Sequence, residues 1–509
     1  MRFPALLMIV CLLCAAASPA PHSYFQIQVI DDQTQRGVPL VELETVNNQR
    51  YITDSNGIVA FYEPGLMDQP VFFSIRSHGY EYRKDSFGYA GVTLTPTSGA
   101  SARISIKRLN VAQRLYRVTG QGIYRDSFLT GDAVPLKQPV LSGKVLGQDS
   151  VMAVPYHNRI YWFWGDTNKP SYPLGHFGTS GATSLLSSQG GLDPSRGVDL
   201  TYFVDKDGFS RKMVPLPDPG PVWIDGLLTV PDSTGRERLL THYCRMKDLG
   251  TVLEHGLAVF NDDTQAFEKL QQLDMAKRWQ CPRTHPFRVK DNNQEYFYFP
   301  TPFPTVRVLA DYAHVTDPGA YEAFTCLRPG SHYDKSAAQL DRTADGQLIY
   351  TWKRNTSPIG QKEERELIAA GLLKPDEAHF QTRDIDTQKP ISMHGGSVYW
   401  NNFRQRYIMI AVQQGGISSY LGEVFFSESP SPTGPWLLAK KILTHDKYTF
   451  YNPTQHPFFD QENGRLIYFE GTYANTFSGN PHQTPRYDYN QIMYLLDLGD
   501  PRLSLSPKP

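Results

Sequence analysis

Acids recur at the ends of short apolar segments in this chain. Asp149 stands just before the apolar run Val151–Val154, and a polar turn leads into a second run, Ile160–Trp164, which is followed by Asp166. Two apolar runs joined by a tight polar turn predict a β-hairpin, in which the start of the first strand and the end of the second share one edge. Asp149 and Asp166 are therefore expected on the same side. Carboxylates held close together are suited to general acid–base chemistry.

The same hairpin pattern occurs five times, and imidazoles replace the acid in the later copies. The fifth copy begins at Thr454–Phe459. The polar residues near the five starts are Asp149, Asp225, His285, His394, and Gln455 or His456, and successive starts, counted to His456, lie 76, 60, 109 and 62 residues apart. Three of these intervals suit four-stranded blades of a β-propeller. The long interval predicts an insertion at 331–390 with a helix at Gln361–Leu373, and a sixth blade hidden there is the alternative.

A propeller gathers the starts of its innermost strands around one end of a central channel. The residues expected there are acids, imidazoles and aromatic rings, which together suit acid–base catalysis. The predicted catalytic residues are Asp149, Asp225 and Glu470, the last because a carboxylate in the apolar run Ile467–Gly471 must be paired or functional. The predicted substrate-binding residues are Asp166, Trp164, Trp223, His285, His394, Gln455 and His456. Turn capping by Asp149 and an orienting role for Asp166 are the structural alternatives.

Composition excludes several classes of function. The 509 residues include 50 basic and 51 acidic side chains, without the basic stripe that nucleic acid requires. No segment is apolar enough for a transmembrane helix, and phosphate-loop and dinucleotide fingerprints are absent from the sequence. The histidines match no metal-ligand spacing, so no metal or other cofactor is expected, with a channel metal held by His285, His394 and His456 as the alternative. The sequence gives no indication of oligomeric state.

Domain boundaries follow from changes in the pattern. Residues 1–20 read as a cleaved signal peptide, which predicts a secreted or periplasmic protein. Residues 22–108 show the short alternating runs of a small β-sandwich, 109–140 form a connector, 141–500 the propeller, and 501–509 a tail. The mature chain keeps Cys244, Cys281 and Cys326, which are expected to be buried thiols with at most one disulfide.

Two stretches resemble known families. Gly37–Leu43 followed by Tyr51–Val59 is similar to carboxypeptidase regulatory-like (transthyretin-like) domains. The run Ser427–Trp436 (SESPSPTGPW), joined to five hairpins, resembles the five-bladed propeller glycoside hydrolases around families 43, 32, 117, 130 and 183. In the family-43 pattern the acid at the entrance of the first blade is the base, and Asp149 matches it. The family places an Asp and a Glu proton donor at later entrances.

His285 and His394 stand where the resemblance would place acids, so the proton donor is expected to be Asp225, Glu470 or another carboxylate of the same face. The sequence thus predicts an all-β protein, a small sandwich followed by a five-bladed propeller. The resemblance implies a secreted enzyme that hydrolyses glycosidic bonds of a polysaccharide or oligosaccharide. The alternatives are a polysaccharide lyase that uses His and Tyr on uronate sugars, and a carbohydrate- or protein-binding propeller without catalysis.

Overall fold

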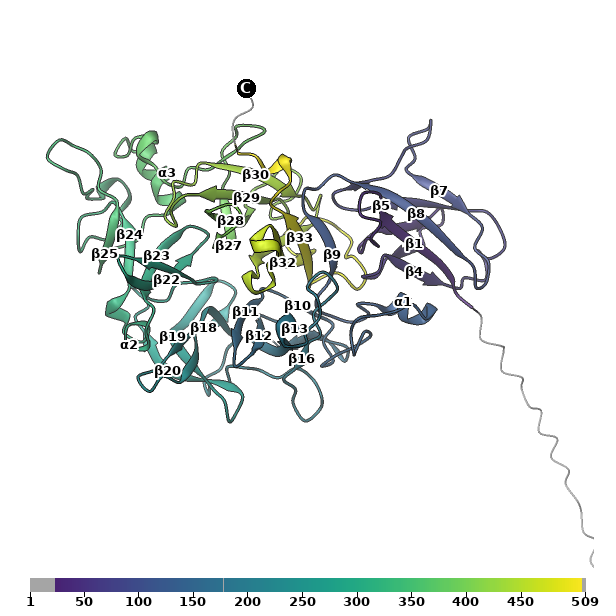
Figure 1. The fold of residues 1–509 in the computed structure, drawn as a ribbon, viewed down its shortest axis with the longest axis horizontal. Coiled ribbons are helices and arrows are strands. Elements are labelled where there is room, and N and C mark those ends of the chain that lie inside the picture. Colours follow the sequence, from purple (N-terminus) through teal and green to yellow (C-terminus); the bar gives the residue numbers. More distant parts are fainter. Residues whose placement is uncertain (1–22, 177, 506–509) are drawn as a thin grey trace, which may run out of the picture.

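The strands form two parts, a small sandwich and a ring of five sheets (Figure 1). The computed structural model describes residues 23–176 and 178–505, and the predicted signal peptide lies outside them. The predicted fold class is confirmed by the strand pairing. No helix in the described part of the chain is both long and apolar enough to cross a membrane.

The sandwich packs two four-stranded sheets around an apolar core. Alternate residues of its strands are buried, as in β1, where Phe25, Ile27 and Val29 point inward. One sheet has the order β4 (Ile58–Phe61), β1 (Phe25–Asp31), β8 (Ser101–Arg108), β6 (Tyr80–Glu81), and the other β3 (Arg50–Ile52), β2 (Glu42–Thr45), β5 (Val71–Arg76), β7 (Gly91–Leu94).

The first two blades are the predicted hairpins, each extended by outer strands. In blade 1 the turn is His157-Asn158, both with positive φ, which suits a two-residue hairpin turn. Blade 1 contains β11 (Met152–Tyr156), β12 (Arg159–Trp164), β15 (Ser180–Leu185) and β16 (Thr201–Tyr202). Blade 2 contains β17 (Val222–Pro231), β18 (Glu237–Asp248), β19 (Thr251–Asn261) and β20 (Ala266–Leu273). A small extra sheet beside blade 1 joins β10 (Gly147–Gln148), β13 (Thr167–Lys169) and β14 (Tyr172–His176).

Blades 3 and 4 absorb the predicted insertion as outer strands and a helix. Among the described residues no sheet corresponds to a sixth blade. The predicted helix is present as α3 (Gln361–Ala369), four residues shorter than expected. Blade 3 contains β21 (Phe287–Asp291), β22 (Gln294–Pro300), β23 (Pro304–Leu309), β24 (Glu322–Thr325) and β25 (Thr351–Arg354), with α2 (Tyr312–Val315) between β23 and β24. Blade 4 contains β27 (Met393–Asn401), β28 (Arg406–Gln413), β29 (Val424–Ser429), β30 (Leu438–Leu443) and β26 (Arg383–Asp384).

Blade 5 is completed by a strand from the connector and corrects the fifth hairpin. Its first strand begins at Thr449, five residues before the predicted start, and Pro457–Phe459 forms a 3₁₀ turn instead of continuing the strand. Proline at 457 favours the turn because it lacks the N–H that a ladder needs. Blade 5 contains β31 (Thr449–Gln455), β32 (Leu466–Ala474), β33 (Asn490–Asp497) and, paired antiparallel to β33, β9 (Gln113–Arg117).

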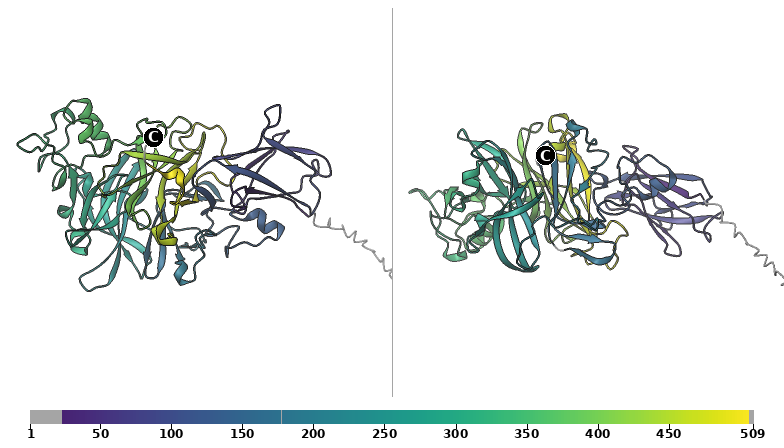
Figure 2. Two further views of the ribbon diagram at one scale, coloured as in Figure 1. Left: turned by 45° about the horizontal axis from the view of Figure 1, so that its top comes forward. Right: turned by 90° about the horizontal axis from the view of Figure 1, so that it is seen from below.

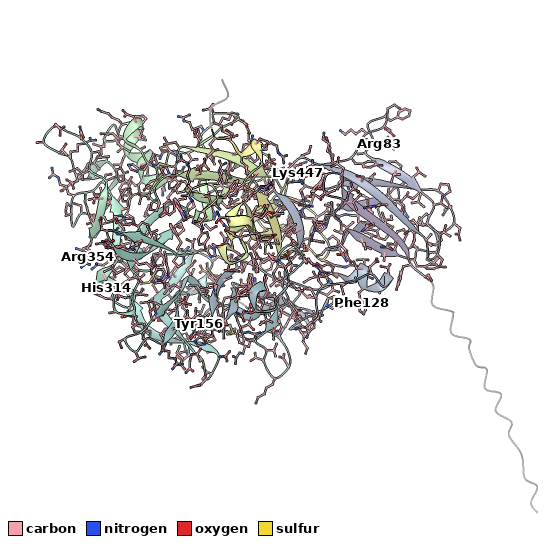
Figure 3. All side chains as sticks on the ribbon, viewed as in Figure 1. Arg83, Phe128, Tyr156, His314, Arg354 and Lys447 are labelled. Carbon is pink, nitrogen blue, oxygen red and sulfur yellow. The ribbon has the colours of Figure 1, made fainter. Side chains whose placement is uncertain are left out.

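The blades hold together because both faces of each sheet are apolar. In β12, Tyr161 and Phe163 belong to the core shared with blade 2, whereas Trp162 and Trp164 belong to the core shared with blade 5. Period-two alternation thus divides a continuous aromatic run between two neighbours. Tyr156, labelled in Figure 3, lies at the far end of β11. Its hydroxyl donates to Oδ1 of Asp262, between β19 and β20 of blade 2, at 3.0 Å.

The sandwich packs against blade 5 and shares a core with blades 4 and 5. Leu40 and Ile52 of the sandwich join the same apolar cluster as Ile410 and Tyr494. The buried guanidinium of Arg114 in β9 donates to the carbonyls of Pro39, Leu40 and His78 and to the hydroxyls of Ser77 and Tyr494. Helix α1 (Arg125–Thr130) lies along the sandwich, and the two further views show the sandwich beside the ring (Figure 2).

Three cysteines lie in the propeller as buried free thiols. They are Cys244, Cys281 and Cys326. Burial raises the pKa of the Cys244 and Cys326 thiols to about 11, so both stay protonated at neutral pH. They fill the interior as small apolar side chains.

Candidate functional site

The innermost strands begin around one end of the channel, which we call the mouth, and contacts link these starts to one another. Asn452 of blade 5 donates through Nδ2 to Oγ of Ser150 in blade 1 at 2.8 Å. Gly395 of blade 4 approaches Asn452 so closely that a Cβ there would lie 2.6 Å from its Oδ1. Trp223 of blade 2 reaches Asp166 of blade 1. Contacts therefore join blades 4, 5, 1 and 2 in succession at the mouth.

Asp149 is surrounded by hydrogen-bond donors. Its Oδ1 accepts from the backbone N–H of Asp166 at 2.9 Å, and its Oδ2 accepts from the hydroxyl of Tyr451 at 2.8 Å. Burial raises the pKa of Asp149, while the amide of Asp166 and the hydroxyls of Tyr451, Tyr489 and Ser150 lower it. These donors stabilise the carboxylate form within an otherwise desolvating site.

Asp166 lies beside Asp149, as the hairpin predicted. Its Oδ1 accepts from the indole Nε1 of Trp223 and from the backbone N–H of Gly178, both at 2.8 Å. Burial, and after it the negative charge of Asp149, raise the pKa of Asp166 to about 6. The two neighbouring acids are therefore held in different hydrogen-bond environments, with several donors on Asp149 and a charge-repelled, partly buried carboxyl group on Asp166.

Asp225 lies on the blade 2 side, next to the segment that enters blade 3. Its Oδ1 accepts from the backbone N–H of Thr284 at 3.1 Å, and the N–H of the next residue, Gly226, donates to the carbonyl of Thr284 at 2.9 Å. Burial raises the pKa of Asp225, and the charge of Arg283 lowers it. Asp225 is thus a half-buried acid with fewer donors than Asp149 and a cation nearby.

His394 and Trp223 complete the predicted rim. His394 is the second residue of β27 and is exposed, and partial burial of its ring lowers its pKa, so it is neutral at neutral pH. Trp223 is partly exposed and is held by its bond to Asp166. Each side chain comes from the start of an innermost strand, where the repeat placed it.

Other predicted residues lie below the mouth. Gln455 and His456 are at the opposite end of β31, because that strand begins earlier than predicted; this corrects their placement at the entrance of blade 5. Both are buried: Gln455 Nε2 donates to the two carboxyl oxygens of Asp460 at 3.2 and 3.0 Å, and His456 Nε2 lies 2.7 Å from Oε1 of Glu470. Glu470, predicted to be catalytic, has no exposed surface and lies against His456.

His285 and Trp164 are also interior residues. His285 follows Thr284 and is buried; burial, and then the nearby His456, lower the pKa of His285 to about 3, so its ring stays neutral. Trp164 packs parallel to Trp162 with ring centroids 6.5 Å apart. No three His, Cys, Asp or Glu side chains in the described ranges are arranged to hold a metal ion.

The sequence missed three residues of the mouth. Tyr451, Asn452 and Tyr489 surround Asp149 and Ser150. Tyr451 and Asn452 stand just before the predicted fifth hairpin, so correct placement of that strand would have found them. Tyr489 precedes β33, and nothing in the repeat marks it.

Comparison with known proteins finds similar structures and no similar sequence families. No protein-family model matches the chain, and no curated protein matches it. An exo-β-1,3-galactanase from Phanerochaete chrysosporium, solved with β-1,3-galactotriose, matches with a TM-score of 0.36 and 8% identity over 76% of this chain and 65% of that chain. An α-L-arabinofuranosidase from Fusarium graminearum gives a TM-score of 0.34 and 10% identity over 76% of this chain and 98% of its own. An exo-1,5-α-L-arabinanase from a bovine ruminal metagenomic library gives 0.33 and 9% over 69% and 93%. The five-bladed fold rests on the strand pairing of this chain, independently of these matches.

Proposed function

We propose that this protein is an exported glycoside hydrolase that cleaves a polysaccharide or oligosaccharide at the propeller mouth. The observation that carries the proposal is a set of three carboxylates, Asp149, Asp166 and Asp225, in unlike environments at one opening. Hydrolysis of a glycosidic bond needs one carboxylate to act as base or nucleophile and one protonated carboxyl to donate to the leaving oxygen. The partly exposed rings of Trp223 and Tyr451 offer apolar faces to a sugar.

Asp149 is assigned the role of base or nucleophile. Several donors converge on its two oxygens, and they oppose the rise in pKa that burial causes. Asp166 is a positioning residue: its backbone N–H fixes Asp149, and its own carboxylate holds Trp223 in place.

Asp225 is assigned the role of proton donor. Burial raises its pKa, and only one donor, the N–H of Thr284, is recorded for its carboxyl group among the described residues. A desolvated acid with few donors keeps its proton to higher pH. Glu470, which is fully buried against His456, is assigned a structural role instead.

The test separates the two catalytic roles. Wild type is assayed on a panel of polysaccharides and aryl glycosides, and Asp149→Asn is expected to lose about 10²–10⁴-fold in kcat on every substrate that wild type cleaves. Asp225→Asn should lose a similar factor on natural substrates but keep much of its rate on aryl glycosides with an acidic leaving group, because these need no proton donor. Asp263→Asn, in an exposed turn of blade 2, is the matched control and should keep full activity. Full activity of Asp149→Asn and Asp225→Asn would remove the assignment.

Product analysis distinguishes hydrolysis from elimination. A lyase would release a sugar with a new carbon–carbon double bond, seen by ultraviolet absorbance, and a hydrolase would not. Burial and the charge of Asp149 raise the pKa of Tyr451 far above its usual range, which makes this tyrosine a poor base for elimination.

A further inference from the structure

A basic segment lies where blade 2 leads into blade 3. Lys277, Arg278 and Arg283 fall within seven residues of one another between β20 and β21, and each is exposed or half-buried. No salt bridge recorded within 23–176 and 178–505 involves any of the three. By contrast Arg288, five residues after Arg283, pairs with Glu295. Arg283 thus makes no recorded ion pair within the described residues, and one acid on which its charge acts is Asp225.

The backbone next to Arg283 is fixed at the mouth. Thr284 donates its N–H to Asp225, accepts from the N–H of Gly226, and donates its hydroxyl to the carbonyl of Pro300. Thr284 also has a φ of 72°, a conformation that a β-branched residue adopts only when its surroundings impose it. Three contacts from two blades therefore hold the residue beside Arg283 against the proposed proton donor.

The guanidinium lies close enough to the site to act on its titratable groups. The charge of Arg283 lowers the pKa of Asp225, against the larger effect of burial, and lowers the pKa of His255, for which burial is again the larger cause. The charge of Arg278 also lowers the pKa of His255. The charges of Arg278 and Arg283 therefore both act on His255, and the charge of Arg283 also acts on Asp225.

We propose, on the basis of the proposed function, that the substrate is an acidic glycan and that Arg283 binds an anionic group on the sugar next to the cleaved bond. A planar guanidinium makes paired hydrogen bonds to a carboxylate or a sulfate, and an unpaired one at a binding site is ready to do so. Burial of Asp225 favours its uncharged form, which reduces repulsion between the donor and such a sugar. The shared chemistry is an anionic oxygen group on a pyranose or furanose ring.

The experiment is retention of the full-length mature protein on a glycan array that contains uronate, sulfated and neutral glycans. The wild-type protein is expected to be retained on acidic glycans, with a signal that falls as the sodium chloride concentration rises. Arg283→Ala should lower retention on them at least tenfold, Arg283→Lys should lower it less, and Arg288→Ala, which removes a paired arginine, should match wild type. Uronate-only or sulfate-only retention identifies the anion.

Retention on neutral glycans alone, no retention on acidic ones, or an unchanged signal with Arg283→Ala overturns the inference, provided that thermal unfolding shows each variant folded. Failure of this inference differs from failure of the proposed function. Hydrolysis of neutral glycans alone would support the proposed hydrolase function and reject the binding of acidic glycans. Tight binding of acidic glycans without cleavage would support the inference and reject the hydrolase function.

Discussion

The hydroxyl of Tyr451 donates to Oδ2 of Asp149 at 2.8 Å across a separation of 302 residues. This bond joins the innermost strand of the last blade to the entrance of the first. The hydrogen bond between Tyr451 and Asp149 therefore links closure of the ring to the protonation state of the proposed base.

Tyr451→Phe should weaken catalysis and move the acidic limb of the pH–rate profile to higher pH. The variant removes a donor that favours ionised Asp149, so the pKa of Asp149 should rise further. A hydrogen bond to a charged group contributes about 1.5–3 kcal/mol, which corresponds to a loss of about 10- to 100-fold in kcat/KM. Tyr468→Phe, which removes a tyrosine hydroxyl bonded to Gln461 elsewhere in blade 5, is the control. An acidic limb that stays in place would argue against the link.

The ionisation of Asp166 should change the fluorescence of Trp223. The indole N–H of Trp223 donates to Asp166, whose pKa is raised to about 6, so ionisation of the acid changes the charge at the indole. Asp166 is protonated below this pH and ionised above it. The difference in fluorescence between wild type and Trp223→Phe should titrate with a midpoint near pH 6. Asp166→Asn should abolish that transition, and a transition that persists would contradict the assignment.

Asp460 should make stability depend on pH. Burial raises the pKa of its carboxyl group to about 8, far above the value of about 3.9 expected in the unfolded chain. The folded state therefore holds a proton that the unfolded state has lost, and this group destabilises the fold progressively as pH rises from about 4 to about 8. Asp460→Asn should be more stable than wild type, with a gain that grows by at most about 1.4 kcal/mol per pH unit over that range and then levels off. Urea unfolding at several pH values measures it; parallel curves for the two proteins would refute the prediction.

His456→Ala should destabilise the propeller strongly. It leaves the fully buried carboxylate of Glu470 without its one recorded partner, since Oε2 of Glu470 already has no hydrogen bond within the described residues. Breaking a buried ion pair by removing one member costs about 3–5 kcal/mol. His456→Gln keeps a hydrogen-bond donor and should lose less stability.

Glu470→Gln should keep hydrolytic activity, because Glu470 has a structural role and takes no part in catalysis. Loss of turnover in a well-folded Glu470→Gln protein would restore Glu470 as a catalytic candidate.

The alternation of apolar and polar residues in the sequence predicts the features that depend on short-range strand and turn geometry. Hairpins with clear turns were found, and Asp149 and Asp166 share an edge because strand geometry requires it. The fifth hairpin begins five residues earlier than predicted because β31 continues through Pro453, so Tyr451 and Asn452 lie in a strand. The prediction that Glu470 is catalytic rests on its place in an apolar run. Its partner His456 lies 14 residues earlier, just before a 3₁₀ turn, and periodicity does not reveal that pairing.

The outer strand of blade 5 has a consequence for how the protein is made. Residues 113–117 are synthesised long before their partner strand, 490–497. Until then β9 presents an open edge, of the kind that recruits foreign strands, and Arg114 can already anchor it to the carbonyls of the finished sandwich. The amino-terminal module would thus hold the strand that completes blade 5 until its partner is made, and a chain truncated before residue 490 would leave the ring open.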